Sequence, residues 1–140
     1  MTGQTSETHE YERVATAASR IAHCYQAELG RCLTISVTRG RSPQTARLLQ
    51  ERLNKHGVGD VSHQLVARTL DLHACHGVWI IQNGFALEDM PITGWLKTQL
   101  DLSFPYFRAI IILEGTPSAK LVRNLDLLGA IPVEAGETVE

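Results

Sequence analysis

The segment from residue 38 to residue 45, TRGRSPQT, contains the residue types that could bind an anion. It follows a short apolar run and precedes a helical pattern, and Ser42-Pro43 is typical of a helix start, with Ser42 as the N-cap and Pro43 in the first turn. Free backbone N–H groups and the positive end of the helix dipole would point into this loop. We therefore expect a site for phosphate or another anion, formed by Thr38, Arg39, Gly40, Arg41, Ser42, Gln44 and Thr45. In the alternative interpretation, Ser42 only caps a helix and both arginines are solvated.

Two further loops are candidates for the same site. The apolar run at 78–81 is followed by Gln82, Asn83, Gly84 and Phe85, and the run at 108–113 is followed by Glu114, Gly115 and Thr116. The carboxyl ends of parallel strands meet at one edge of a sheet, where open α/β sheets bind their ligands. We therefore expect the loops 38–45, 82–91 and 114–118 to converge. Phe85 could stack on a planar ring there, or could only pack against its neighbours.

The elements that must position these loops follow from hydrophobic spacing. Helical spacing marks 10–29, 43–56 and 92–102, and a last helix follows Thr116-Pro117, which repeats the cap-then-proline pattern, and runs to Leu128. Strand-like runs lie at 32–37, 61–67, 78–81, 108–113 and 130–133. The second is interrupted by polar residues, which predicts a place near a sheet edge, and a turn is expected at 70–76. Gly30, Gly57 and Gly129 are candidate helix stops, and residues 1–8 look like a frayed tail.

Alternation of strands and helices predicts an α/β fold, a parallel sheet covered by helices on both faces. The chain has 140 residues, which is enough for a single core. We expect a polar tail and an amphipathic helix in residues 1–30, packed on an α/β domain at 31–140.

Composition limits the classes of protein to consider. The chain is 44% hydrophobic and 20% charged, with a formal net charge of -2, and it lacks both a long basic stripe and an apolar run of membrane-spanning length. We therefore expect a cytoplasmic protein without nucleic-acid or membrane partners, and a small phosphorylated molecule as ligand. The three cysteines, an odd number, favour reduced thiols over a disulfide framework.

Together these segments resemble the flavodoxins and their relatives among the NAD(P)H-dependent FMN reductases. The likeness rests on LTISVTRGRSPQTARLLQERL, on HGVWIIQNGFALEDMPITGWLKTQL and on FRAIIILEGTPSAKLVRNLDLLGAIPV, and covers residues 32–134 as an order of elements. It implies a three-layer, flavodoxin-like sheet of five parallel strands. No helix follows the last strand, so we expect the extra N-terminal helix to cover the face that a final helix would occupy.

The resemblance also implies a function. The three loops would hold FMN or a similar phosphorylated cofactor, with Phe85 at the aromatic position near the flavin and Glu114 next to it. The flavin would carry out its own redox chemistry, so no catalytic side chain needs to be visible. The protein would act as an electron carrier or an FMN-dependent oxidoreductase, with a redox partner protein or a second copy of itself, in a homodimer, as partners.

Two other chemistries find less support in the sequence. Arg-Ser-Pro after a strand also resembles the loop of low-molecular-weight tyrosine phosphatases, which places a cysteine six positions before the arginine. Here Ile35 lies six positions before Arg41, and Cys32 is expected inside the strand, so a thiolate nucleophile is disfavoured. His73, Cys75 and His76 lie close together but lack an evident partner pair, so we expect no metal site.

The competing function is a non-catalytic regulatory or protein-interaction domain. It would be either a flavodoxin-like domain without its cofactor or a STAS-like module. Residues 78–134 fit the STAS order of strand, helix, strand and helix, whereas the strand at 61–67 has no place in that order.

Overall fold

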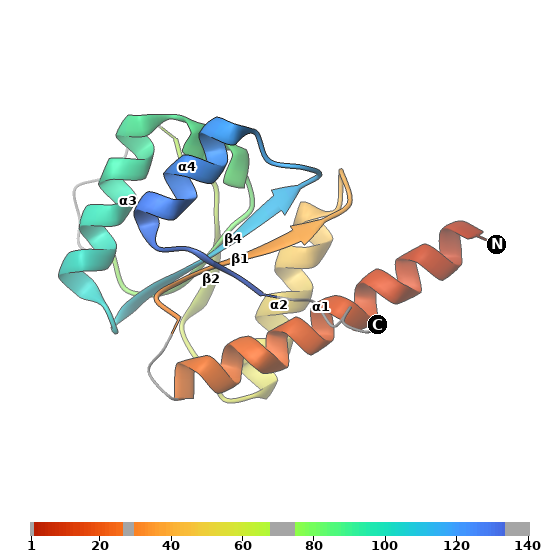
Figure 1. Ribbon diagram of the computed structural model, residues 1–140. Coiled ribbons are helices and arrows are strands. Elements are labelled where there is room, and N and C mark those ends of the chain that lie inside the picture. Colours follow the sequence, from red (N-terminus) through yellow and green to blue (C-terminus); the bar gives the residue numbers. More distant parts are fainter. Residues whose placement is uncertain (1, 27–29, 68–74, 134–140) are drawn as a thin grey trace.

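In the computed structural model, the chain forms a parallel sheet between two layers of helices (Figure 1). The structure describes residues 2–26, 30–67 and 75–133. The predicted α/β fold, with five parallel strands, helices on both faces and an N-terminal helix, is confirmed.

The elements follow one another in the order expected from hydrophobic spacing. Their bounds are α1 Thr2–Gln26, β1 Cys32–Val37, α2 Ser42–Lys55, β2 Val61–Gln64, β3 Gly77–Ile81, the 3₁₀ helix η1 Gly84–Glu88, α3 Met90–Ser103, β4 Phe107–Glu114, α4 Ala119–Leu128 and β5 Ile131–Pro132. Helix α1 begins at Thr2, so the expectation of a frayed tail over residues 1–8 is wrong for residues 2–8. The predicted turn at 70–76 lies largely outside the described residues, and so does the acidic C-terminal end.

Strand order is the feature of the sheet that local sequence could not reveal. The order is β2-β3-β4-β1-β5, with every pair parallel. β2 lies at an edge, as its interrupted pattern predicted. The layers are compatible with a flavodoxin-like fold, but a flavodoxin sheet has the order 2-1-3-4-5. Here β1 lies between β4 and β5 instead of beside β2.

The two faces of the sheet carry separate hydrophobic cores. Helices α1 and α2 cover one face, while η1, α3 and α4 cover the other (Figure 1). Helix α1 buries an apolar stripe that includes Val14, Ala18 and Ile21 against α2 and the inward side chains of β1 and β4. It therefore shares a core with the residues that follow it.

The opposite placement of the helices locates the switch point of the sheet. Helix α2 follows β1 and packs on one face of the sheet. Helix α4 follows the neighbouring strand β4 and packs on the other face. In open parallel sheets, a crevice forms outside the carboxyl ends of two such strands. Here the switch point lies between the loops 38–41 and 115–118.

Candidate functional site

The carboxyl ends of the neighbouring strands β1 and β4 bring the predicted loops 38–45 and 114–118 together. Gly115 N–H donates to the Val37 carbonyl at 3.0 Å, which joins the two loops at their base. A Cβ atom on Gly115 would lie 3.8 Å from Arg39 Nε, so the Arg39 side chain lies against the second loop. These two loops therefore converge as predicted. The third loop, 82–91, also meets the loop after β4, because the Ser118 hydroxyl donates to Glu88 Oε2 at 2.7 Å.

The start of helix α2 differs from the sequence prediction. The N-cap position is Arg41, with φ −98° and ψ 0°, and its side chain makes no capping hydrogen bond; Ser42 is already the first helical residue. The expectation that Ser42 caps the helix is therefore wrong. The acceptor comes instead from the neighbouring strand, because Glu114 Oε2 accepts a hydrogen bond from Ser42 N–H at 3.1 Å.

Glu114 is thus the negatively charged group that accepts a hydrogen bond from the start of α2 in this structure. The nearby Ser42 hydroxyl, then the backbone N–H groups of Gly40 and Ser42, and the charge of Arg39 hold the pKa of Glu114 below its usual range, although partial desolvation opposes the shift. The Ser42 N–H is the better defined donor, since the Ser42 hydroxyl lies outside hydrogen-bonding geometry with the described residues. A carboxylate of the chain itself therefore stands where a phosphate oxygen was expected.

A second carboxylate, which the sequence analysis missed, reaches the same loop from helix α1. Glu10 Oε2 accepts hydrogen bonds from Thr38 N–H at 2.9 Å and from the Thr38 hydroxyl at 3.1 Å, and Glu10 Oε1 lies 3.7 Å from Arg41 Nε. No local signal could have identified Glu10, because it is separated from Thr38 by 28 positions and lies on a helix whose docking is a tertiary property.

The remaining side chains predicted for the anion site are buried, line a separate groove or are exposed after β4. Ser42 and Thr45 are buried. Gln44 and Thr45 line a groove of about 340 Å³ between α1 and α2, together with Tyr11, Val14 and Leu48. Thr116 is exposed just after the end of β4. Thr116-Pro117 is not the start of the next helix: Ser118 is the N-cap of α4, and its hydroxyl oxygen accepts from Leu121 N–H at 3.1 Å.

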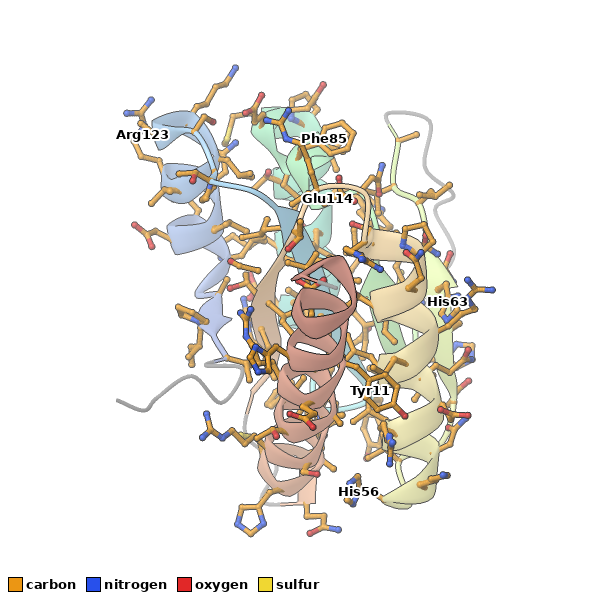
Figure 2. All side chains as sticks on the ribbon, turned by 90° about the vertical axis from the view of Figure 1, so that its right-hand side faces the viewer. Tyr11, His56, His63, Phe85, Glu114 and Arg123 are labelled. Atoms are coloured by element: carbon orange, nitrogen blue, oxygen red, sulfur yellow. The ribbon has the colours of Figure 1, made fainter. Side chains whose placement is uncertain are left out.

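The third predicted loop is a structural support rather than an open turn. Asn83 Oδ1 accepts from Val66 N–H at 3.0 Å, and Asn83 Nδ2 donates to the Val66 carbonyl at 2.8 Å. Gly84 begins η1 against β4, where a Cβ atom would collide with the Ile112 carbonyl and lie 2.7 Å from Ile111 Cγ2. The side chain of Phe85 is 68% exposed at the top of the molecule (Figure 2). It is therefore accessible to a partner.

The hydrogen-bond donors at the start of α2 and in the loop before it fit an FMN phosphate poorly. A phosphate at the start of α2 would face the carboxylates of Glu114 and Glu10, which already accept the N–H groups of Ser42 and Thr38. Two negative charges at a phosphate site oppose the binding of a dianion. The FMN prediction stays open to a binding test, but we derive no chemistry through a flavin.

Cys32, the cysteine nearest in sequence to the loop 38–45, is the first residue of β1 and lies at the strand end away from that loop. Burial raises the pKa of Cys32 to about 12, so its side chain is a neutral thiol at physiological pH. Among the described residues, no three or more His, Cys, Asp and Glu side chains are grouped closely enough to hold a metal ion. No helix in the described part of the chain is long and apolar enough to cross a membrane.

Comparison with known proteins assigns the chain to no family. No family model, no curated protein and no solved structure matches the chain. The site is therefore interpreted from its own geometry.

Proposed function

We propose that this protein is a non-catalytic regulatory or protein-interaction domain. The observation that carries the proposal is the occupation of the loop at the start of α2 by Glu114 and Glu10, the chain's own carboxylates. A loop that a cofactor protein would keep open for phosphate is here used to join α1, β4 and α2. The loop stabilises the domain, and partner proteins would bind to the exposed surface of the domain.

The conformation of η1 supports the same proposal. The Leu87 carbonyl accepts two hydrogen bonds of 2.7 Å, one from the Thr93 hydroxyl and one from Asn124 Nδ2, and both donor side chains are buried. Phe85, two residues earlier, therefore stands on a well-supported backbone while its ring remains in solvent. An aromatic side chain presented in this way loses little entropy when it binds.

The sequence of elements after residue 77 is also the one on which the STAS-like interpretation rests. Strand β3, helix α3, strand β4 and helix α4 follow in turn, with β3 and β4 adjacent in the sheet. The edge strand β2 is the element that departs from that order. We use the likeness for the class of function only, a domain that acts by binding another protein.

Two measurements test the proposal. Native mass spectrometry of the purified wild type should detect no retained flavin. An FMN fluorescence titration of the wild type, run beside Glu114→Ala, should detect no binding of added flavin to the wild type. A photo-crosslinking phenylalanine analogue at position 85, in the cells that make the protein, should then link it to a defined protein, whereas the same analogue at Tyr106, also highly exposed, should not. Stoichiometric flavin in the wild type, or identical products from both positions, would reject the proposed function.

A further inference from the structure

A cavity of about 410 Å³ lies at the amino ends of β2, β3 and β4. Figure 2 shows His56, shortly before the loop that leads into β2, at the opposite end of the molecule from Phe85 and Glu114. The cavity is therefore remote from the loops that follow β1 and β4, and its volume lies within the range of small-molecule sites. We call it the amino-end cavity, and the residues that line it include Val58, Asp60, His76, Pro105, Tyr106 and Arg108.

Arg108 supplies a positive charge to the wall of the amino-end cavity. Its guanidinium lies 4.4 Å from the centre of the Tyr25 ring and 5.6 Å from that of Phe104, and Nη1 donates to the Tyr25 carbonyl at 3.3 Å. Within the described residues, no carboxylate forms an ion pair with Arg108, and its buried Nε has no hydrogen-bond acceptor. A buried polar atom without a partner in the protein marks a place for a water, an ion or a ligand. A guanidinium in this state favours a ligand that carries a carboxylate.

Asp60 supplies the opposite charge, and the backbone holds it in place. It adopts a left-handed conformation with φ 58°, and its carbonyl accepts a hydrogen bond from Val78 N–H at 2.9 Å. A Cβ atom on Gly77 would lie 2.5 Å from the Asp60 carbonyl oxygen and 2.6 Å from Oδ2, so the carboxylate rests against a position that requires glycine. His76 Nε2 lies 3.6 Å from Oδ2 and forms an ion pair with it only when protonated. The Asp60 side chain is 65% exposed, so its charge is available to a cationic group.

The register of the sheet sets the separation of these two charges. Val61 pairs with Val78, which pairs in turn with Arg108. Asp60 directly precedes Val61, so Asp60 and Arg108 lie on either side of the start of β3. Neighbouring strands are about 4.8 Å apart, which separates the two backbones by about 10 Å and leaves room for a small molecule between the side chains. Asp60 would repel a simple anion and Arg108 a simple cation, whereas a molecule with both charges matches the pair.

We propose that the amino-end cavity binds a free α-amino acid with an apolar side chain. The carboxylate of the ligand would pair with Arg108, and its ammonium would pair with Asp60. Val58 and Pro105 provide an apolar wall, and Tyr106, which is 81% exposed, presents its ring to the side chain of the ligand. The site goes beyond the proposed function, because it gives the domain a small-molecule ligand at the end away from η1.

Isothermal titration calorimetry of the full chain with each proteinogenic amino acid at millimolar concentration tests the assignment. We expect amino acids with apolar side chains, such as leucine and phenylalanine, to bind. N-acetyl-leucine lacks the ammonium and leucinamide lacks the carboxylate, so each should bind more weakly than leucine by about tenfold or more. This comparison uses only the wild type and therefore does not depend on the folding of a variant.

Two variants assign each charge of the ligand to its partner. Asp60→Asn removes the carboxylate and keeps a residue type that tolerates the left-handed conformation. It should weaken the binding of leucine by about tenfold or more without weakening that of N-acetyl-leucine, which has no ammonium to lose. Arg108→Gln should likewise weaken the binding of leucine without weakening that of leucinamide. Asp126→Asn, an exposed position on α4 outside the cavity, is the matched control and should leave the affinity for leucine unchanged.

Four results would overturn the assignment. They are the absence of amino-acid binding at millimolar concentration, a preference for charged side chains, derivatives that bind as tightly as leucine, and equal affinities of the wild type and Asp60→Asn for leucine. If Arg108→Gln fails to fold, the derivatives and Asp60→Asn still decide the question. The proposed function is tested separately, because it depends on flavin binding and on the crosslinks formed at position 85.

Discussion

The side chain of Glu114 carries the proposed function, because its carboxylate lies at the start of α2, where a phosphate was expected. It supplies the acceptor that a capping side chain would normally supply at the start of α2, and it does so from a strand 72 positions further along the chain. A helix N-terminus favours any negative group, whether it belongs to a ligand or to the protein. In this protein the negative group is internal, and the local basic charge of Arg39 serves a structural contact.

The lowered pKa of Glu114 predicts a specific pH dependence of stability. A carboxyl group whose pKa is lower in the folded than in the unfolded state stabilises the fold above its unfolded pKa, about 4.3, and this contribution is lost as the pH falls through the lower folded value. Glu114→Gln should therefore reduce the free energy of unfolding at pH 7 by no more than about 1 kcal/mol, because the side chain is largely exposed, and should change it little at pH 3.

Urea unfolding of both proteins from pH 3 to pH 7 measures this difference. Arg39→Gln is the companion variant, and it should retain most of the dependence, since the charge of Arg39 is the smallest of the named causes that lower the pKa. Parallel pH profiles for the wild type and Glu114→Gln would show that the carboxylate does not stabilise the start of α2.

At the scale of elements, α1 is the unusual component. Its apolar stripe contains Ala17, Ala18 and Ala22, each at most 2% exposed, and small side chains allow a helix to approach its neighbours closely. Polar contacts along its length add to this packing: Tyr11 accepts a hydrogen bond from Arg52 Nη2 at 2.6 Å, and the Arg108 guanidinium lies 4.4 Å from the centre of the Tyr25 ring. Helix α1 is therefore an integral part of one face of the domain.

Truncation of Ile21 tests this view of α1. Ile21 is fully buried between α1, α2 and the sheet, so Ile21→Ala should lower the free energy of unfolding by about 2–5 kcal/mol through lost burial and a cavity. Thr16→Ala, on the exposed side of the same helix, should change it by less than about 0.5 kcal/mol. Chemical denaturation measures both values. A chain without residues 1–29 should fail to fold, and a folded truncation product would refute the integral role of α1.

At the scale of the whole molecule, a single sheet separates two cores, and its strands differ in how they are held. β4 and β1 are hydrogen bonded on both sides and buried between helices, whereas β2 and β5 each have one neighbour. Local opening requires less free energy at such edges than in the centre.

Native-state hydrogen exchange should reflect this order. The amides of Ile110, Ile111 and Ile112 in β4 should exchange only through global unfolding, while those of β2 should exchange through smaller openings, because fewer buried contacts hold that strand. Exchange followed by NMR at several low denaturant concentrations separates the two routes. Equal protection in β2 and β4 would contradict a hierarchy set by strand position.

The sequence by itself determined the elements, because hydrophobic periodicity and stop signals are local. The buried pattern of β4, the edge position of β2 and the left-handed Gly129 after α4, with φ 70°, all follow from nearby residues. The sequence also identified a loop that attracts negative charge. It could not reveal which negative group occupies that loop, nor which strands become neighbours.

The group that occupies the loop and the order of the strands are both set by the tertiary structure. The strand order places β4 beside β1, and this pairing brings the end of β4 beside the start of α2. Glu10 and Glu114 meet the same loop only because the folded chain closes separations of 28 and 72 positions. Electrostatic attraction acts through space, so the occupant of an anion site follows from the fold and not from the motif alone.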